Sequence, residues 1–242
     1  MTYRPEERDG GLAAIFAHPD DESFAAAGTL AMAHDAGRTV RLLLLTRGEA
    51  GNAERSPDLD LADLREEEMR CAAGRIGMDE VTVADHPDGR LAEVPFETLV
   101  DEIAAWLADR RPNAVITFGA HGVTNDPDHV VVGAATRWAV ERLAESGIAP
   151  NAVYVISPVL WPGERRFDLS AEEGAASHRI DITAVAGRKL AALACHASQP
   201  DVAEEIAILR AALDADGVLY EGYTRVRPTV PLARPTFYAA ID

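Results

Sequence analysis

The sequence is poor in basic residues and has no long hydrophobic run. Lys189 is its only lysine, and 23 basic residues stand against 40 acidic ones, for a formal net charge of −17 at pH 7. Nucleic acids and anionic membranes bind proteins through basic surfaces, so we expect neither as a partner. Residues 1–10 are polar and charged, unlike a signal peptide, and no segment resembles a membrane span. We therefore expect a cytoplasmic protein without membrane insertion.

Cysteine is nearly absent, since the chain contains only Cys71 and Cys195. Neither belongs to a C-x-x-C pair, which excludes a zinc site made of cysteines and argues against a disulfide framework. Cys195 precedes His196, but adjacent residues of a helix point about 100° apart and do not face each other. We therefore favour a buried structural cysteine at position 195 over a thiol nucleophile.

The chain does show a regular alternation of apolar runs and helical patterns. This alternation predicts an α/β protein whose mostly parallel sheet carries helices on both faces. No repeat or low-complexity linker interrupts the 242 residues, so we expect a single domain over residues 1–242. The expected strands are 11–17, 39–46, 81–84, 114–118 and 152–157, with strand-like residues at 218–225; the expected helices are 22–36, 61–76, 96–110, 129–146 and one or two within 182–214.

The loop after the first expected strand concentrates polar residues. It reads HPDDE at residues 18–22, where ligands of open α/β sheets usually bind. A helix N-cap would explain one aspartate, but it explains neither the histidine nor the proline beside it. Imidazole nitrogen and carboxylate oxygen together suit a divalent metal such as zinc.

The loop after the fourth expected strand repeats this chemistry as NDPDH at residues 125–129. Alone it is a weak signal, because Asp-Pro-Asp is also common in turns and helix caps. Both loops follow strands of one sheet and should converge on the same edge. Together they predict a catalytic metal site in which three protein ligands leave a position open for water.

These motifs resemble the LmbE/PIG-L family of zinc-dependent N-deacetylases. The most specific element is AHPDDE at 17–22, paired with DPDH at 126–129, where the family has an HPDH-like sequence. The resemblance runs from about residue 12 to residue 199 and implies a three-layer, Rossmann-like fold. Family members often form homo-oligomers, and the sequence leaves the oligomeric state open. The supporting segments are LTRGEAG at 45–51, LREEEMRCAAGRIG at 64–77, HPDGRL at 86–91 and HASQ at 196–199.

Carried over by position, the resemblance implies that His18, Asp21 and His129 bind Zn²⁺, although iron or cobalt would accept the same ligands. Asp20 would be the general base. Two neutral imidazoles and one carboxylate leave a dication with a net charge of about +1, which lowers the pKa of bound water towards about 7. The implied reaction is hydrolysis of an N-acyl group, typically acetyl, on a small amino-sugar-like substrate such as an N-acetylglucosamine compound.

Two further residues are implied to bind the substrate. Arg65 and Asp88 would hold sugar hydroxyls through a guanidinium fork and a carboxylate. Both have ordinary alternatives: Arg65 is followed by Glu66, so a surface ion pair is about as well supported, and Asp88 in Pro-Asp-Gly is a standard turn residue.

One departure of the sequence from the family matters most; a lesser one is Thr124, at or near the position of a tyrosine that some members use. Asp126 stands where the family usually has a histidine that carries a proton and pairs with the aspartate numbered Asp128 here. A carboxylate cannot offer that positive charge at neutral pH. Three explanations stay open: a catalytic set of Asp20, Asp126 and Asp128 works without the histidine, His121 of the same loop substitutes for it at the substrate, or the substrate differs.

The same sequence features allow functions other than N-deacetylation. A metal-dependent amidase acting on a sugar-thiol conjugate or a natural product would use the same residues. A non-catalytic sugar- or metal-binding family member is weakly favoured by Asp126 and disfavoured by Asp20. A nucleotide-binding Rossmann module is disfavoured, because no G-x-G-x-x-G follows the first strand and carboxylates stand where pyrophosphate would bind. His196 fits the family pattern near the site, and a purely structural hydrogen bond is its equal alternative.

Overall fold

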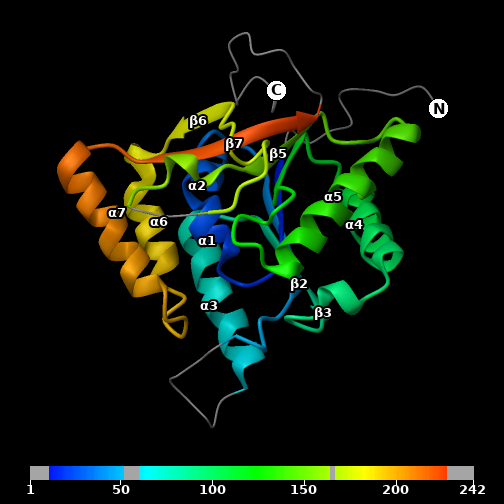
Figure 1. Cartoon of the computed structure of the whole chain (residues 1–242), viewed down its shortest axis with the longest axis horizontal. Coiled ribbons are helices and arrows are strands. Elements are labelled where there is room, and N and C mark those ends of the chain that lie inside the picture. The colour runs from blue at the N-terminus through cyan, green and yellow to red at the C-terminus, as the bar shows by residue number, and fades with distance from the viewer. Residues whose placement is uncertain (1–10, 52–59, 164–166, 228–242) are drawn as a thin grey trace.

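The computed structural model describes residues 11–51, 60–163 and 167–227 (Figure 1). Residues 1–10, from which the absence of a signal peptide was predicted, lie outside them. The described strands form one seven-stranded sheet in the order β3-β2-β1-β4-β5-β7-β6. Strands β1 to β5 pair in parallel, whereas β7 runs antiparallel to β5 and β6 antiparallel to β7. The strands are β1 Leu12–Phe16, β2 Val40–Thr46, β3 Glu80–His86, β4 Ala114–Thr117, β5 Ala152–Ile156, β6 His178–Asp181 and β7 Tyr220–Arg227.

Helices cover both faces of this sheet, which confirms the expected three-layer α/β fold. Figure 1 shows α4 and α5 on one side, and α1, α2, α3, α6 and α7 on the other. Strands β1, β4 and β5 are buried along their whole length, which explains their continuous apolar sequences. The helices are α1 Asp21–Ala25, α2 Ala27–Asp35, α3 Leu61–Ile76, α4 Phe96–Arg110, α5 Pro127–Glu145, α6 Ala186–Leu193 and α7 Val202–Asp216. Within the described ranges, no helix is both long and apolar enough to cross a membrane.

The strand order fixes where the loops of interest meet. From β1 the chain proceeds to β2 and β3 on one side and later to β4 and β5 on the other, so the order reverses between β1 and β4. Ligands of open α/β sheets bind outside the carboxyl ends of the strands at such a reversal. The loops 18–22 and 125–129 follow these two strands and therefore meet there.

The helix predicted over residues 22–36 is in fact two helices, α1 and α2. The chain breaks at Ala26, whose φ is −141° and ψ −1°. The first backbone N–H groups of α2, at Gly28 and Thr29, donate to the carboxylate of Glu221 at 3.0 and 2.8 Å. Glu221 is paired with Lys189 at 2.8 Å, and the Lys189 ammonium also donates to the carbonyls of α1 residues. A buried ion pair from distant segments thus caps both helix ends, which local sequence could not reveal.

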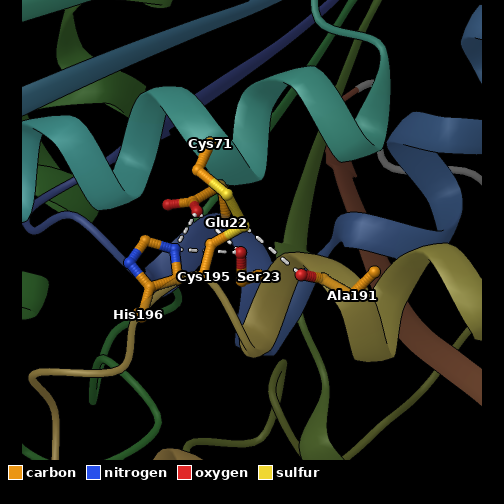
Figure 2. Close-up of a disulfide and its surroundings, with 6 residues drawn as sticks. All are labelled: Glu22, Ser23, Cys71, Ala191, Cys195 and His196. Atoms are coloured by element: carbon orange, nitrogen blue, oxygen red, sulfur yellow. Dashed lines mark hydrogen bonds and ion pairs between the residues drawn. A yellow bond between two sulfur atoms is a disulfide. The ribbon is translucent and has the colours of Figure 1, made fainter.

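The prediction for the cysteines was wrong. Cys71 of α3 and Cys195, just beyond α6, form a disulfide across 124 residues of sequence (Figure 2). Cys71 is exposed and Cys195 is half-buried rather than buried, but its disulfide agrees with a structural cysteine rather than a thiol nucleophile. The physical reason is that α3 packs against α6, which brings the two Cα atoms to 5.8 Å, within disulfide range. The C-x-x-C rule does not reach residues so far apart in sequence.

Candidate metal centre and active site

A cavity of about 690 Å³ opens at the carboxyl ends of the parallel strands. Its floor comes from the loops after β1 and β4, including His18, Asp21 and His129. Its far wall comes from Ile156, Trp161 and Phe167, and from α7 with the residue before it. The predicted metal ligands therefore line the same cavity as apolar side chains from later in the chain.

The three ligands implied by the sequence converge in the structure. Nδ1 of His18 lies 3.2 Å from Nε2 of His129, and Oδ1 of Asp21 lies 3.2 Å from the same Nε2. Donor atoms about 2.0–2.1 Å from a tetrahedral zinc ion lie about 3.3 Å from one another. These two spacings are compatible with ligands of one small tetrahedral cation, and all three residues line the open cavity.

Neighbouring groups fix the orientation of each ligand. Oδ2 of Asp21 accepts the backbone N–H groups of Ala17 and His18 at 3.2 and 2.8 Å, which leaves Oδ1 for the cavity. The ring of His129 stacks on Phe118, with centroids 4.0 Å apart, and its Nδ1 lies 3.0 Å from the carbonyl of Gly122. A proton on Nδ1 donated to that carbonyl leaves the Nε2 lone pair free for a metal.

The second ring nitrogen of His18 faces two carboxylates. Nε2 lies 3.0 Å from Oδ1 of Asp88 and 3.4 Å from Oδ2 of Asp128. Burial lowers the pKa of His18, but the hydrogen bonds to Asp128 and Asp88 and the charge of Asp21 outweigh it and raise the pKa to about 11. The pocket thus holds several carboxylates that favour positive charge, which suits a bound cation.

Two ligand-type clusters stand out among the described residues, and both include His18. One adds Asp126 and His129, and the other adds Asp88 and Asp128. In the second cluster Asp128 already accepts the N–H groups of Gly89 and Leu91 at 2.8 and 2.9 Å. Asp128 is therefore held by backbone groups while it faces His18, whereas the cluster with His129 includes residues that line the open cavity.

Asp20 has a strained backbone and a well-held carboxylate. Its φ of 117° lies in the left-handed region that a non-glycine residue rarely adopts. Its Oδ2 lies 2.9 Å from the guanidinium of Arg65, which also donates to the carbonyl of Pro19 at 2.5 Å. Burial raises the pKa of Asp20 to about 6, although Arg65 opposes that rise.

The structure also shows the burial and the contacts of three further residues that the sequence predicted for the site. Arg65 is only 4% exposed, so the alternative of a surface ion pair with a neighbouring glutamate is wrong. Asp88 lines the cavity, and its Oδ2 accepts the N–H of Ala50 at 2.7 Å. Asp126 also lines the cavity, but its Oδ1 accepts the N–H of Asp128 at 2.8 Å as the N-cap of α5.

Two predicted residues do not reach the cavity surface. Asp128 has no exposed area and lies behind His18. His121 is absent from the lining, and its Nδ1 lies 2.9 Å from the carbonyl of Asp168. The structure thus gathers the predicted metal ligands and Asp20, and leaves His121 aside.

The sequence did not indicate the far wall of the cavity. Trp161 and Phe167 form an edge-to-face aromatic pair with ring centroids 5.9 Å apart, and Ile208 of α7 lies on the same side. Acidic residues of α7 and the segment before it, such as Glu204, join them. These residues belong to no motif, because single apolar or acidic residues far along the chain give no signal until the fold brings them together.

Comparisons with known proteins agree with this geometry. The family model described as PIG-L, GlcNAc-PI de-N-acetylase, matches residues 13–140. A 1D-myo-inositol 2-acetamido-2-deoxy-alpha-D-glucopyranoside deacetylase of Tsukamurella paurometabola is 28% identical, over 79% of this chain and 84% of the relative.

Solved structures share the fold at lower identity. The N,N'-diacetylchitobiose deacetylase of Pyrococcus horikoshii has a TM-score of 0.68 and 20% identity, covering 91% of this chain and 85% of that one. The 4-carboxy-2-hydroxymuconate hydratase of Pseudomonas putida KT2440 has a TM-score of 0.70 and 22% identity, covering 93% of this chain and 100% of that one. One fold thus carries two chemistries, so function has to be argued from the site.

Proposed function

Because its residues 13–140 match the PIG-L model, the chain belongs to that family, and we propose that it is a metal-dependent N-deacetylase. Its substrate is an N-acetylglucosamine-like amide, and the acyl group that leaves is typically acetyl. The observation that carries this proposal is the meeting of His18, Asp21 and His129 on the wall of an open cavity, where Nε2 of His129 lies 3.2 Å from each of the other two residues.

The donor set fits zinc. Two imidazole nitrogens and one carboxylate oxygen form a common catalytic zinc set, and the carboxylates around His18 complete an environment that attracts a cation. When bound there, zinc supplies Lewis-acid chemistry and makes water more acidic. Iron or cobalt stays an alternative with the same ligands.

Asp20 is the general base in this proposal. Its carboxylate belongs to the residue next to a ligand and lies in the cavity lining, where it can accept a proton from the attacking water. Arg65 holds this carboxylate in place, and Asp128 holds His18. Asp88 and Asp126 line the cavity and are placed to contact hydroxyls or the amide of the substrate.

Because His121 does not line the cavity, we favour the first of the three explanations for the aspartate at position 126, in which the catalytic set works without a histidine there. The site works without a histidine at that position, and Asp126 serves first as the cap that sets the start of α5. The proton for the leaving amine then comes back from Asp20, which takes it from water earlier in the reaction.

The far wall indicates a substrate larger than one sugar. A cavity of about 690 Å³ exceeds what a single amino sugar fills, and Trp161 and Phe167 offer an aromatic surface to whatever is attached to it. An amidase acting on a sugar-thiol conjugate or a natural product is therefore the second candidate. Comparing the rates on N-acetylglucosamine and on its phenyl glycoside distinguishes the two candidates. A higher rate on the glycoside would favour the larger substrate, because only an attached group can contact Trp161 and Phe167.

Three further features complete the proposal. The chain acts as one domain on small molecules, in the cytoplasm, either alone or as a homo-oligomer. In a reducing cytoplasm Cys71 and Cys195 would be kept as thiols. Thiol labelling in intact cells tests this directly, and a fully oxidised pair would argue for an oxidising compartment.

The first experiment measures metal content and acetate release together, in the wild type and in His129→Ala. We expect about one zinc per chain, lost in the variant, with acetate released from N-acetylglucosamine compounds by the wild type only. Bound zinc without acetate release from any N-acetyl sugar would favour another acyl group or a binding role. No metal in either protein after zinc addition would overturn the mechanism.

A further inference from the structure

A buried polar network adjoins the loop at residues 18–22, which carries His18 and Asp21. Glu22, Ser23 and His196 have no exposed area. Nε2 of His196 lies 2.9 Å from Oε1 of Glu22, and the Ser23 hydroxyl donates to the same oxygen at 2.7 Å. Figure 2 shows the three side chains converging between α1 and the end of α6.

The second oxygen of Glu22 contacts Asp20. Oε2 accepts the Asp20 backbone N–H at 3.1 Å, and this is the peptide of the residue with φ 117°. A non-glycine residue keeps such a backbone only where its surroundings determine it. The Glu22 carboxylate is therefore one of the groups that hold Asp20 in its unusual conformation.

Only one of the two ring nitrogens of His196 makes polar contacts. Its Nδ1 is buried and has no hydrogen-bond partner, whereas Nε2 meets Glu22 and lies 3.2 Å from the Ser23 hydroxyl. The histidine is thus placed to fix the Glu22 carboxylate, which reaches Asp20 in turn. An apolar side chain of similar size could fill this space, but it could not form the hydrogen bond that Nε2 makes with Glu22.

The segment that carries His196 is tied to a second support of Asp20. Cys195 is bonded to Cys71 of α3, and α3 also carries Arg65, which holds the Asp20 carboxylate. Asp20 is therefore held at its N–H by Glu22, which His196 contacts, and at its carboxylate by Arg65 of α3. The disulfide joins the two supports.

From this network we propose that His196 is a positioning residue for Asp20, acting through the Glu22 carboxylate. The inference rests on the proposed function in one respect, namely that Asp20 is the proton acceptor. Loss of the His196 Nε2 contact lets the Glu22 carboxylate turn and the Asp20 peptide relax, which moves the base while the three metal ligands stay in place.

The test is a matched pair of variants, His196→Gln and His196→Asn. A glutamine amide can place its nitrogen where Nε2 lies, whereas the shorter asparagine amide reaches only the position of Nδ1, which has no partner. With N-acetylglucosamine as the probe, we expect the asparagine variant to lose about 10- to 100-fold in kcat, with KM and zinc content unchanged. The glutamine variant should stay close to wild type.

A second readout needs no substrate. Hydrogen exchange of the Asp20 amide reports its bond to Glu22, so exchange should speed up in the asparagine variant and stay slow in the glutamine variant. Equal exchange and equal kcat in wild type and both variants would overturn the proposal, and so would equal loss in both.

Two controls keep the outcomes apart. If His196→Asn does not fold, Glu22→Met against Glu22→Gln asks the same question, because methionine removes the acceptor for the Asp20 N–H and glutamine retains one. If Asp20→Asn keeps wild-type turnover, the base assignment fails, whereas an inactive Asp20→Asn beside a fully active His196→Asn refutes the positioning role alone.

Discussion

The loops at residues 18–22 and 125–129 have nearly the same composition but use their carboxylates differently. In the first, Asp21 directs Oδ1 towards Nε2 of His129, and Asp20 has a strained backbone and a carboxylate held by Arg65. In the second, Asp126 is an ordinary N-cap with φ −62°, and Asp128 is buried behind His18. The first loop therefore presents both of its aspartates to the cavity, whereas the second uses Asp126 to cap α5 and Asp128 to contact His18. Similar motifs thus divide into chemistry and support according to the backbone that carries them.

The largest expected effect comes from Asp20. Asp20→Asn keeps the shape of the side chain but removes the proton acceptor, so turnover should fall by about 10²- to 10⁴-fold while zinc content is retained. Steady-state rates beside metal analysis check this. Loss of zinc together with activity would mean that Asp20 belongs with the ligands.

Asp128→Asn tests the supporting role in the second loop. The buried carboxylate accepts two backbone N–H groups and faces His18, so its replacement should weaken zinc affinity by about 10- to 100-fold. Competition with a chelator measures this affinity. Zinc binding equal to that of wild type would contradict the role given to Asp128.

The disulfide offers a test of stability beside the two loops. Replacing Cys71 and Cys195 by alanine should lower the free energy of unfolding by about 2–4 kcal/mol, because the bond closes a long segment of chain. Denaturant unfolding of the oxidised wild type and the double variant gives the difference. Identical midpoints would show that the bond contributes nothing in solution.

Asp126 allows capping and catalysis to be separated. Asp126→Ser retains a capping oxygen and Asp126→Ala does not, so alanine alone should cost about 1 kcal/mol of stability. If Asp126 only caps α5, the serine variant should keep its turnover. A large rate loss in the serine variant would instead assign the carboxylate a direct role at the substrate.

The last expected effect is confined to acidic pH and concerns a histidine outside both loops. Burial and the charge of Arg225 lower the pKa of His178 from 6.5 to about 4, opposite to the shift of His18. Between these values the unfolded chain binds a proton that the folded chain does not, so stability falls as pH drops from 6.5 to about 4. Unfolding at several pH values should show a shallower fall in His178→Gln. An unchanged slope would exclude His178 as the source.

The sequence predicted the parts of this molecule that local pattern controls. Buried parallel strands appear in the sequence as apolar runs, and HPDDE directly after the first of them predicts a cluster of polar side chains at the carboxyl edge of the sheet. The convergence of His18 with His129, 111 residues apart, followed from the shared edge of the two strands.

Features set by distant partners could not be predicted. The break at Ala26 depends on Glu221, which lies 193 residues from Gly28, and the disulfide depends on how α3 packs on α6. Arg65 was ambiguous for the same reason, because its neighbours in sequence are glutamates whereas its partner in space is Asp20. Propensity and motif describe short segments, and these contacts join segments that only the fold brings together.

The buried Lys189 has a practical consequence for anyone who handles this protein. It is the only lysine of the chain and is 3% exposed, with its ammonium held by Glu221 and two carbonyls. Amine-directed dyes, cross-linkers and resins therefore find no accessible lysine side chain in the folded state. Conjugation through carboxylates suits this acidic surface better, and lysine reactivity becomes a direct reporter of unfolding.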